Sequence, residues 1–90
     1  MKHFDLIVSG NVQGVSYRAS TKAVADQLGI RGYVINRPDG TVYIEAEGKP
    51  FALDIFLDWC KEGPENAKVE SVDQSESALK NFHNFEIRKK

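Results

Sequence analysis

Cysteine is almost absent from this chain: only Cys60 occurs among its 90 residues, so no internal disulfide can form. Its apolar runs fall far short of the roughly 18 residues that a membrane-spanning helix needs. The N-terminal stretch also lacks the basic and then apolar order of a secretory signal peptide. These absences predict a protein of the reducing cytoplasm that has no contact with a membrane.

An excess of either charge is also missing. The chain carries 12 Lys and Arg against 13 Asp and Glu, which gives a formal net charge of −1 at pH 7. A surface that tracks the phosphates of a nucleic acid usually needs a clear basic excess. The one basic cluster, residues 88–90, is typical of a solvated tail. The composition therefore predicts no nucleic-acid partner.

Metal-ligating and nucleophilic side chains are few and scattered. His3 and His83 lie near opposite ends of the chain, and neither belongs to a His, Cys, Asp or Glu group at metal-ligand spacing. We expect both to be surface histidines, and we expect no metal or other cofactor. Cys60 is expected in the core, and neither Cys60 nor Ser16 has a nearby base in the sequence that could activate it as a nucleophile.

What the chain does have is the composition of an ordinary globular protein, with 41% hydrophobic and 28% charged residues. Its length predicts one domain over residues 1–90. Hydrophobic periodicity and turn residues predict the element order βαββαβ, followed by one more short strand. The strands are expected at 4–10, 30–36, 42–47, 69–75 and 82–88, and the helices at 17–28 and 50–61.

This order is the ferredoxin-like, or split-βαβ, pattern of the α+β class. It predicts an antiparallel-rich sheet with both helices on one face and a short extra strand at the C-terminus. The other face, which carries Tyr43, Glu45 and Glu47, is expected to be solvated. The strands at 4–10 and 30–36 should run parallel with a third strand between them, so their carboxyl ends should open at the same edge of the sheet.

The stretch GNVQGVSYR, from Gly10 to Arg18, joins the first strand to the first helix. Its glycines allow a tight turn that exposes successive backbone N–H groups at a helix N-terminus, where unpaired donors and the helix dipole favour an anion. Arg18 adds a planar guanidinium that can hold two phosphate oxygens at once. The loop lacks the ending of a P-loop and the third glycine of a dinucleotide fingerprint, which favours a single phosphoryl group. A purely structural turn accounts for the same residues.

Asn36 is predicted to lie near Arg18, because it ends the second strand at the same edge of the sheet. Two interpretations of this residue stay open. Its amide could hold a water beside a bound phosphorus atom. It could instead cap the turn at residues 37–41, which is a common role of asparagine before a turn.

These two segments carry a resemblance to a known family. GNVQGVSYR resembles the Gly-x-Val-Gln-Gly-Val-x-Phe/Tyr-Arg signature of acylphosphatases. GYVINRPDGTV, residues 32–42, resembles their second signature, Gly-aromatic-Val-x-Asn-x-x-Asp-Gly-x-Val. The resemblance covers essentially the whole chain. It implies a small, metal-free enzyme that hydrolyses acyl phosphates to a carboxylate and inorganic phosphate.

The resemblance also implies roles for particular residues. Arg18 corresponds to the phosphate-binding catalytic arginine, and Asn36 corresponds to the asparagine that orients the attacking water. A phosphate cradle is implied for the backbone N–H groups of Gly14, Val15, Ser16, Tyr17 and Arg18. An acyl phosphate is then the small-molecule partner, inorganic phosphate is both product and competitive inhibitor, and the enzyme is expected to be a monomer.

Two functions of other classes stay open on the sequence alone. The same fold can serve as a non-catalytic anion-binding or regulatory module, because a fold does not determine a function. Split-βαβ domains can also bind RNA through exposed aromatic residues on the sheet. Tyr43 is such a residue, but Glu45 and Glu47 beside it would repel phosphates. The presence of both Arg18 and Asn36 favours hydrolysis.

Overall fold

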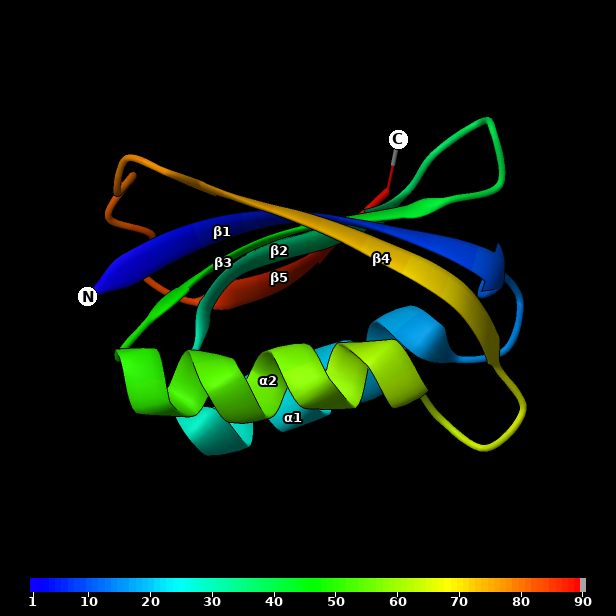
Figure 1. Ribbon diagram of the computed structural model, residues 1–90, viewed down its shortest axis with the longest axis horizontal. Helices are drawn as coiled ribbons and strands as arrows, with labels where there is room; N and C mark the ends of the chain where they lie inside the picture. The colour runs from blue at the N-terminus through cyan, green and yellow to red at the C-terminus, as the bar shows by residue number, and fades with distance from the viewer. Residues whose placement is uncertain (90) are drawn as a thin grey trace.

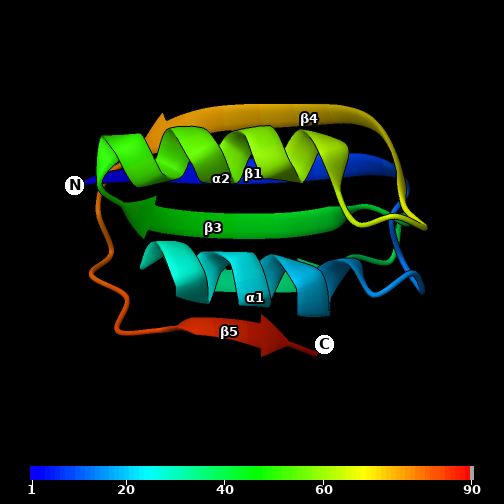
Figure 2. The ribbon, with the colours of Figure 1, turned by 90° about the horizontal axis from the view of Figure 1, so that it is seen from below.

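The computed structural model describes residues 1–89, which form one five-stranded sheet with two helices (Figure 1). The elements in chain order are β1 (Lys2–Asn11), α1 (Tyr17–Leu28), β2 (Arg31–Asn36), β3 (Val42–Gly48), α2 (Pro50–Glu62), β4 (Lys68–Ser77) and β5 (Phe85–Arg88). Both helices lie on the same face of the sheet, as Figure 2 shows from below. The predicted α+β class and the predicted order of elements are therefore confirmed.

The strands are arranged in the order β4-β1-β3-β2-β5. Every neighbouring pair is antiparallel except β2 and β5, which run parallel. Because β3 is antiparallel to both β1 and β2, those two strands are parallel to each other and end at the same edge of the sheet. This arrangement places the loop that follows β1 beside the end of β2, as the element order predicted.

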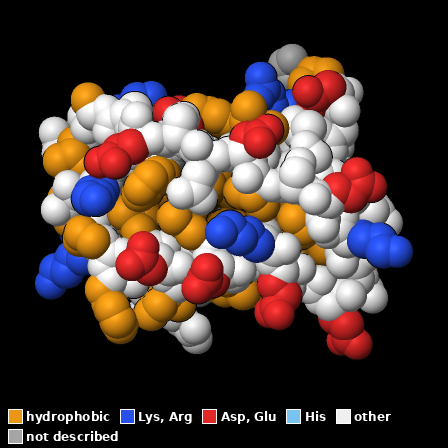
Figure 3. All heavy atoms as spheres, in the orientation of Figure 1, with side chains coloured by type: hydrophobic (Ala, Val, Ile, Leu, Met, Phe, Trp, Pro, Cys, Tyr) orange, Lys and Arg blue, Asp and Glu red, His pale blue; other side chains and the backbone are white. Residues whose placement is uncertain are grey.

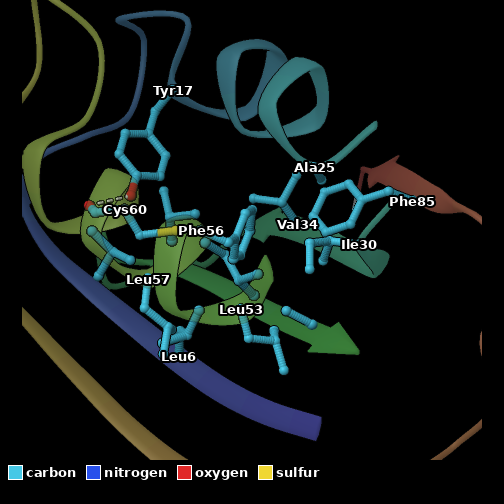
Figure 4. Packing of buried hydrophobic residues seen from close by; sticks show 14 of the residues in the cluster. Leu6, Tyr17, Ala25, Ile30, Val34, Leu53, Phe56, Leu57, Cys60 and Phe85 are labelled. Atoms are coloured by element: carbon cyan, nitrogen blue, oxygen red, sulfur yellow. Dashed lines mark hydrogen bonds between the residues drawn. The ribbon is translucent and has the colours of Figure 1, made fainter. Parts of the chain in front are cut away.

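The core lies between the sheet and the helices, and it includes Cys60 as expected (Figure 4). Helix α1 ends at Leu28 and is capped by Gly29, whose φ of 73° lets the N–H groups of Gly29 and Ile30 bond back to the last turn of the helix. The hydroxyl of Tyr17 crosses the core and donates to the carbonyl of Cys60 at 2.7 Å, which joins the start of α1 to the end of α2. Within residues 1–89, neither helix is both long and apolar enough to span a membrane.

The last strand starts later than predicted, at Phe85 rather than at residue 82. The reason is the segment 78–84, which passes from β4 at one edge of the sheet to β5 at the other, along the end where β1 begins (Figure 2). The N–H groups of Lys80, Asn81 and Phe82 in this segment donate to the carboxylate of Glu47 on β3 instead of to a neighbouring strand. Backbone donors that bond a side chain cannot extend a strand ladder, so the strand is shorter than its hydrophobic pattern suggests.

The expectation that Glu45, Glu47 and His3 are solvated is wrong. Their exposed fractions are 4%, 1% and 0% respectively, whereas His83 is exposed as predicted. Segment 78–84 covers this end of the sheet, and the ring of Phe82 stacks on His3 with centroids 6.0 Å apart. The alternation of β3 correctly predicted which face these side chains occupy, but it did not reveal that another segment covers that face.

Ionisable side chains at this end of the sheet form a connected group, three of them buried, which we call the His3 cluster: His3, Asp5, Glu45, Glu47 and Lys80. The ring of His3 places Nδ1 2.8 Å from Glu47 and Nε2 2.9 Å from Asp5 and 3.2 Å from Glu45. Lys80 adds an ion pair with Glu45 at 2.7 Å. The cluster ties β1 and β3 to the segment that leads into β5.

Hydrogen bonds lower the pKa values of two carboxyl groups in this cluster. Burial by itself would raise the pKa of Glu47, but the N–H groups of Lys80 and Phe82 and the imidazole of His3 outweigh it, so that the pKa lies below its ordinary value. Burial is likewise outweighed at Glu45, chiefly by Lys80 and by the hydroxyl of Tyr33, and the pKa is lowered. These carboxylates are therefore held ionised more strongly in the folded chain than in the unfolded chain.

Replacing Glu47 with glutamine should lower the free energy of unfolding at pH 7 by about 2–3 kcal/mol, because the change removes a buried charge that is paired and hydrogen-bonded. A group whose folded pKa is lowered stabilises fully above its unfolded value, here 4.5, and the stabilisation is lost as the pH falls through the folded pKa. The difference in free energy of unfolding between wild type and Glu47→Gln should therefore become smaller below pH 4.5. Urea unfolding at pH 7, 5 and 3.5 measures it.

The matched control is Glu76→Gln, which makes the same substitution at an exposed position of β4. Surface changes of this kind usually alter stability by less than about 0.5 kcal/mol. If Glu47→Gln were as stable as Glu76→Gln at pH 7, the bonds to segment 78–84 would contribute nothing to stability.

The face seen in Figure 3 carries interspersed acidic and basic side chains. This mixed surface is consistent with the nearly balanced charge of the sequence.

Candidate functional site

A hollow opens at the edge of the sheet where β1 and β2 end, beside the first turn of α1. It is lined by Val12, Gly14, Ser16, Tyr17, Arg18, Ala19, Asn36 and Ile87. The structure thus brings Arg18 and Asn36 together with three of the four other predicted cradle residues. Val15 is not in contact with the hollow and instead packs against the core. Ile87 comes from β5 and was not foreseen, because nothing in the sequence links the C-terminal strand to this loop.

Two residues of the loop adopt the left-handed backbone conformation before α1 begins. Gly14 has a φ of 75° and Ser16 a φ of 62°, although serine rarely adopts this conformation. A Cβ on residue 14 would meet no atom within 4 Å, so glycine is required there by the backbone angle and not by lack of space. Alternation of this kind turns successive N–H groups toward one concave side, which is the geometry of anion-binding nests.

The N–H groups of residues 14–18 donate to no acceptor among the described residues of the chain. They lie at the N-terminus of α1, where the helix dipole adds partial positive charge. Ser16 is the N-cap residue of the helix, yet its side chain makes no capping hydrogen bond. This end of the helix therefore presents free donors to the hollow.

Among the described residues 1–89, Arg18 supplies the only charged side chain that lines the hollow. It is half-buried, and its Nη1 donates to the backbone carbonyl of Arg88 on β5 at 3.1 Å. Among residues 1–89 no carboxylate lies within ion-pair distance of this guanidinium. The remaining donors of Arg18 and its full positive charge are thus available to an anion.

Asn36 is the last residue of β2 and lines the hollow, and its side-chain oxygen Oδ1 is buried without a hydrogen-bond partner among the described residues. Buried polar atoms are nearly always paired, so an unpaired one marks a place where a ligand or water binds. The adjoining turn is held without Asn36: Asp39 accepts hydrogen bonds from the N–H and hydroxyl of Thr41. The side chain of Asn36 makes none of the bonds that a turn cap would make.

Gln13 links the loop to the hairpin between β2 and β3. Its amide Nε2 donates at 2.8 Å to the carbonyl of Arg37 and at 2.8 Å to the carbonyl of Thr41. The sequence by itself did not indicate a role for Gln13. Its position inside the GNVQGVSYR stretch was the one available signal, because the bonded partners are 24 and 28 positions away.

No nucleophile of the cysteine or tyrosine type is activated near the hollow. Burial raises the pKa of Cys60 to about 12, and burial likewise raises that of the Tyr17 hydroxyl, which points into the core and not into the hollow. Both groups therefore stay protonated at neutral pH and do not form the thiolate or phenolate that covalent catalysis would use.

A second group of polar side chains could hold a metal ion, although no such group was expected from the spacing of residues in the sequence. Ligand atoms of His3, Asp5 and Glu45 lie within 4.8 Å of one another. These atoms already bond one another, and the ring of His3 is also bonded to Glu47. The group lies at the opposite end of β1 from the hollow, so it contributes nothing to the chemistry there.

The hollow therefore combines a row of free backbone N–H groups, a guanidinium with no carboxylate partner among residues 1–89, and an asparagine whose amide oxygen is unpaired. The first two recognise a tetrahedral anion such as a phosphoryl group, by charge and by directed donors. The third can accept a hydrogen bond from a neighbouring water. Such a set can bind a phosphoryl group and present a water to it.

Comparisons with known proteins agree on one family. The family model described as Acylphosphatase matches residues 4–87. The chain is 48% identical to an acylphosphatase of Archaeoglobus fulgidus over 92% of this chain and 93% of that protein. It is 47% identical to one of Ligilactobacillus salivarius over 97% and 98% of the two chains. A crystal structure of acylphosphatase from Bacillus subtilis superposes with a TM-score of 0.95 at 39% identity, covering 98% of this chain and 99% of that chain.

Proposed function

The chain belongs to the acylphosphatase family and is an enzyme that hydrolyses acyl phosphates, and we propose that the hollow beside α1 is the site where it does so. In this proposal the products are a carboxylate and inorganic phosphate. The observation that carries the assignment is that Asn36, whose Oδ1 has no hydrogen-bond partner among residues 1–89, lines the same hollow as Arg18 and the loop with its free N–H groups.

The loop and Arg18 bind the phosphoryl group. Backbone N–H groups of residues 14–18 hold its equatorial oxygens, and the guanidinium of Arg18 adds a charged, two-pronged contact. Phosphoryl transfer depends mainly on positioning and on stabilising charge at these oxygens, so donors fixed in place before the reaction can lower its barrier by several kcal/mol.

Asn36 positions the attacking water. Its Oδ1 accepts one hydrogen of the water, which aims the water's lone pair at phosphorus from the side opposite the leaving group. An amide cannot take up a proton at neutral pH, so the proton of the water passes to an oxygen of the substrate phosphoryl group. The leaving carboxylate has a conjugate acid with a pKa of about 4 and departs without a general acid.

Hydrolysis of benzoyl phosphate in the presence of excess EDTA tests this proposal. We expect turnover unchanged by EDTA, because Arg18 and the loop supply the positive charge that a metal would otherwise provide. Inorganic phosphate should inhibit competitively, since it occupies the same cradle. Activity that disappears in EDTA and returns with Mg²⁺ would contradict the proposal, as would purely noncompetitive inhibition by phosphate.

Three further expectations belong to this proposal. The enzyme acts as a single domain over residues 1–90, it works as a monomer, and it functions in the cytoplasm, where the free thiol of Cys60 is stable.

A further inference from the structure

The two halves of the proposed site stand on strands that are not neighbours. The cradle loop follows β1 and Asn36 ends β2, and β3 lies between these strands. Adjacent strands are about 4.8 Å apart, so the sheet separates the two ends by roughly 10 Å. β3 pairs with both strands as far as Val42, which lies opposite Val8 of β1 and Asn36 of β2. The loop lies beyond this ladder, so its position relative to Asn36 depends on what bridges the loop and the hairpin.

The side chain of Gln13 makes this bridge. Its two amide hydrogens bond the carbonyls of Arg37 and Thr41, the residues that open and close the turn of the hairpin. Arg37 directly follows Asn36, and the N–H of Arg37 bonds the same carbonyl of Thr41 that Gln13 holds. Any shift of these carbonyls relative to the loop therefore moves Asn36 relative to the cradle.

Neither carbonyl needs Gln13 for its own pairing. The carbonyl of Arg37 also accepts the N–H of Gly40, and the carbonyl of Thr41 also accepts the N–H of Arg37. Asp39 closes the turn independently through Thr41. The hairpin can thus form without Gln13, which means that the contribution of Gln13 is the connection between hairpin and loop.

We propose that Gln13 is a positioning residue that sets the distance between the phosphate cradle and the water held by Asn36. This inference rests on the proposed function, because it assigns the orientation of the water to Asn36. It assigns to Gln13 no contact with substrate. Without the two hydrogen bonds of Gln13, the cradle can still bind phosphate, but the water held by Asn36 is no longer aligned for attack on phosphorus.

The variant Gln13→Met tests this, because methionine has nearly the same length and no charge but donates no hydrogen bond. We expect kcat to fall roughly 10- to 50-fold, since a misplacement of about 1 Å can cost up to 100-fold in rate. The KM and the inhibition constant of phosphate should stay within about threefold of wild type, because the cradle is untouched. Gln27→Met on the exposed surface of α1 is the matched control and should behave as wild type.

A double-mutant cycle with Asn36→Ala decides whether Gln13 acts through Asn36. If it does, Gln13→Met should slow the Asn36→Ala enzyme by less than about threefold, because there is no longer a held water to misplace. If the double variant were slowed by the product of the two single-variant rate losses, the proposal would be overturned. A normal kcat in Gln13→Met would overturn it too. A large rise in the phosphate inhibition constant would overturn it as well, because the residue would then act on the cradle.

The same cycle separates failure of this inference from failure of the proposed function. Normal turnover in Asn36→Ala alone removes Asn36 from the mechanism and overturns both. Slow turnover in Asn36→Ala with normal turnover in Gln13→Met overturns only the role of Gln13.

Discussion

Replacing Arg18 with lysine is expected to slow hydrolysis of an acyl phosphate by roughly 30- to 1000-fold, which corresponds to about 2–4 kcal/mol of lost transition-state stabilisation. Lysine keeps the positive charge but lacks the planar fork that can hold two phosphoryl oxygens. The structure sharpens this expectation, because Arg18 is the one charged residue lining the hollow and has no carboxylate partner among residues 1–89. No other cation of residues 1–89 lines the site, so none of them can replace its contacts.

The measurement is kcat/KM for benzoyl phosphate, together with the inhibition constant of inorganic phosphate. Both should worsen in Arg18→Lys, because phosphate binds through the same guanidinium. Arg37→Lys is the matched control: this side chain lies over the ring of Tyr43, 5.4 Å from its centroid, and does not line the hollow. A rate near wild type in Arg18→Lys would show that the fork is not needed and that charge alone suffices.

Asn36→Ala should hydrolyse acyl phosphate at least roughly 100-fold more slowly than wild type, because orientation of a nucleophile is worth several kcal/mol. Phosphate affinity should stay near wild type, since neither the loop nor Arg18 is altered. The loss should therefore appear in kcat and not in the phosphate inhibition constant.

The stability of the same variant separates the two interpretations of Asn36. A residue that caps a turn contributes about 1 kcal/mol, and its loss would lower the thermal midpoint by several degrees in a domain of this size. The structure shows Oδ1 without a partner, and removing an unpaired buried polar atom costs little stability. We therefore expect a thermal midpoint within about two degrees of wild type.

Asn84→Ala, at an exposed position just before β5, provides the control for the substitution itself. Turnover, phosphate inhibition and thermal midpoint should be measured on one preparation of each variant. If Asn36→Ala turned over normally but melted several degrees lower, Asn36 would be a structural turn residue and the proposed mechanism would lose its water-holding group.

Local features of the chain were sufficient to predict the elements and the sheet. The end of α1 at Leu28 and the hairpin turn at residues 37–41 follow from glycines that adopt positive φ, at Gly29 and Gly40. The alternation along β3 correctly divided its side chains between the two faces. Such signals are readable because the backbone preference of a residue acts over only a few neighbours. Combined with the split-βαβ order, they predicted that the loop after β1 lies beside Asn36.

Contacts between distant segments could not be predicted in this way. The alternation of β3 placed Glu45 and Glu47 on one face. Only the fold shows that segment 78–84 covers these two residues, and that Glu45 pairs with Lys80 of that segment while Glu47 pairs with His3 of β1. The hydrogen bonds from Gln13 to the hairpin, and the position of Ile87 in the lining of the hollow, likewise depend on how distant strands are aligned. A residue's own sequence neighbourhood determines its backbone angles and its face of a strand. What covers that face is determined by segments tens of residues away, whose positions are set by the packing of the whole sheet.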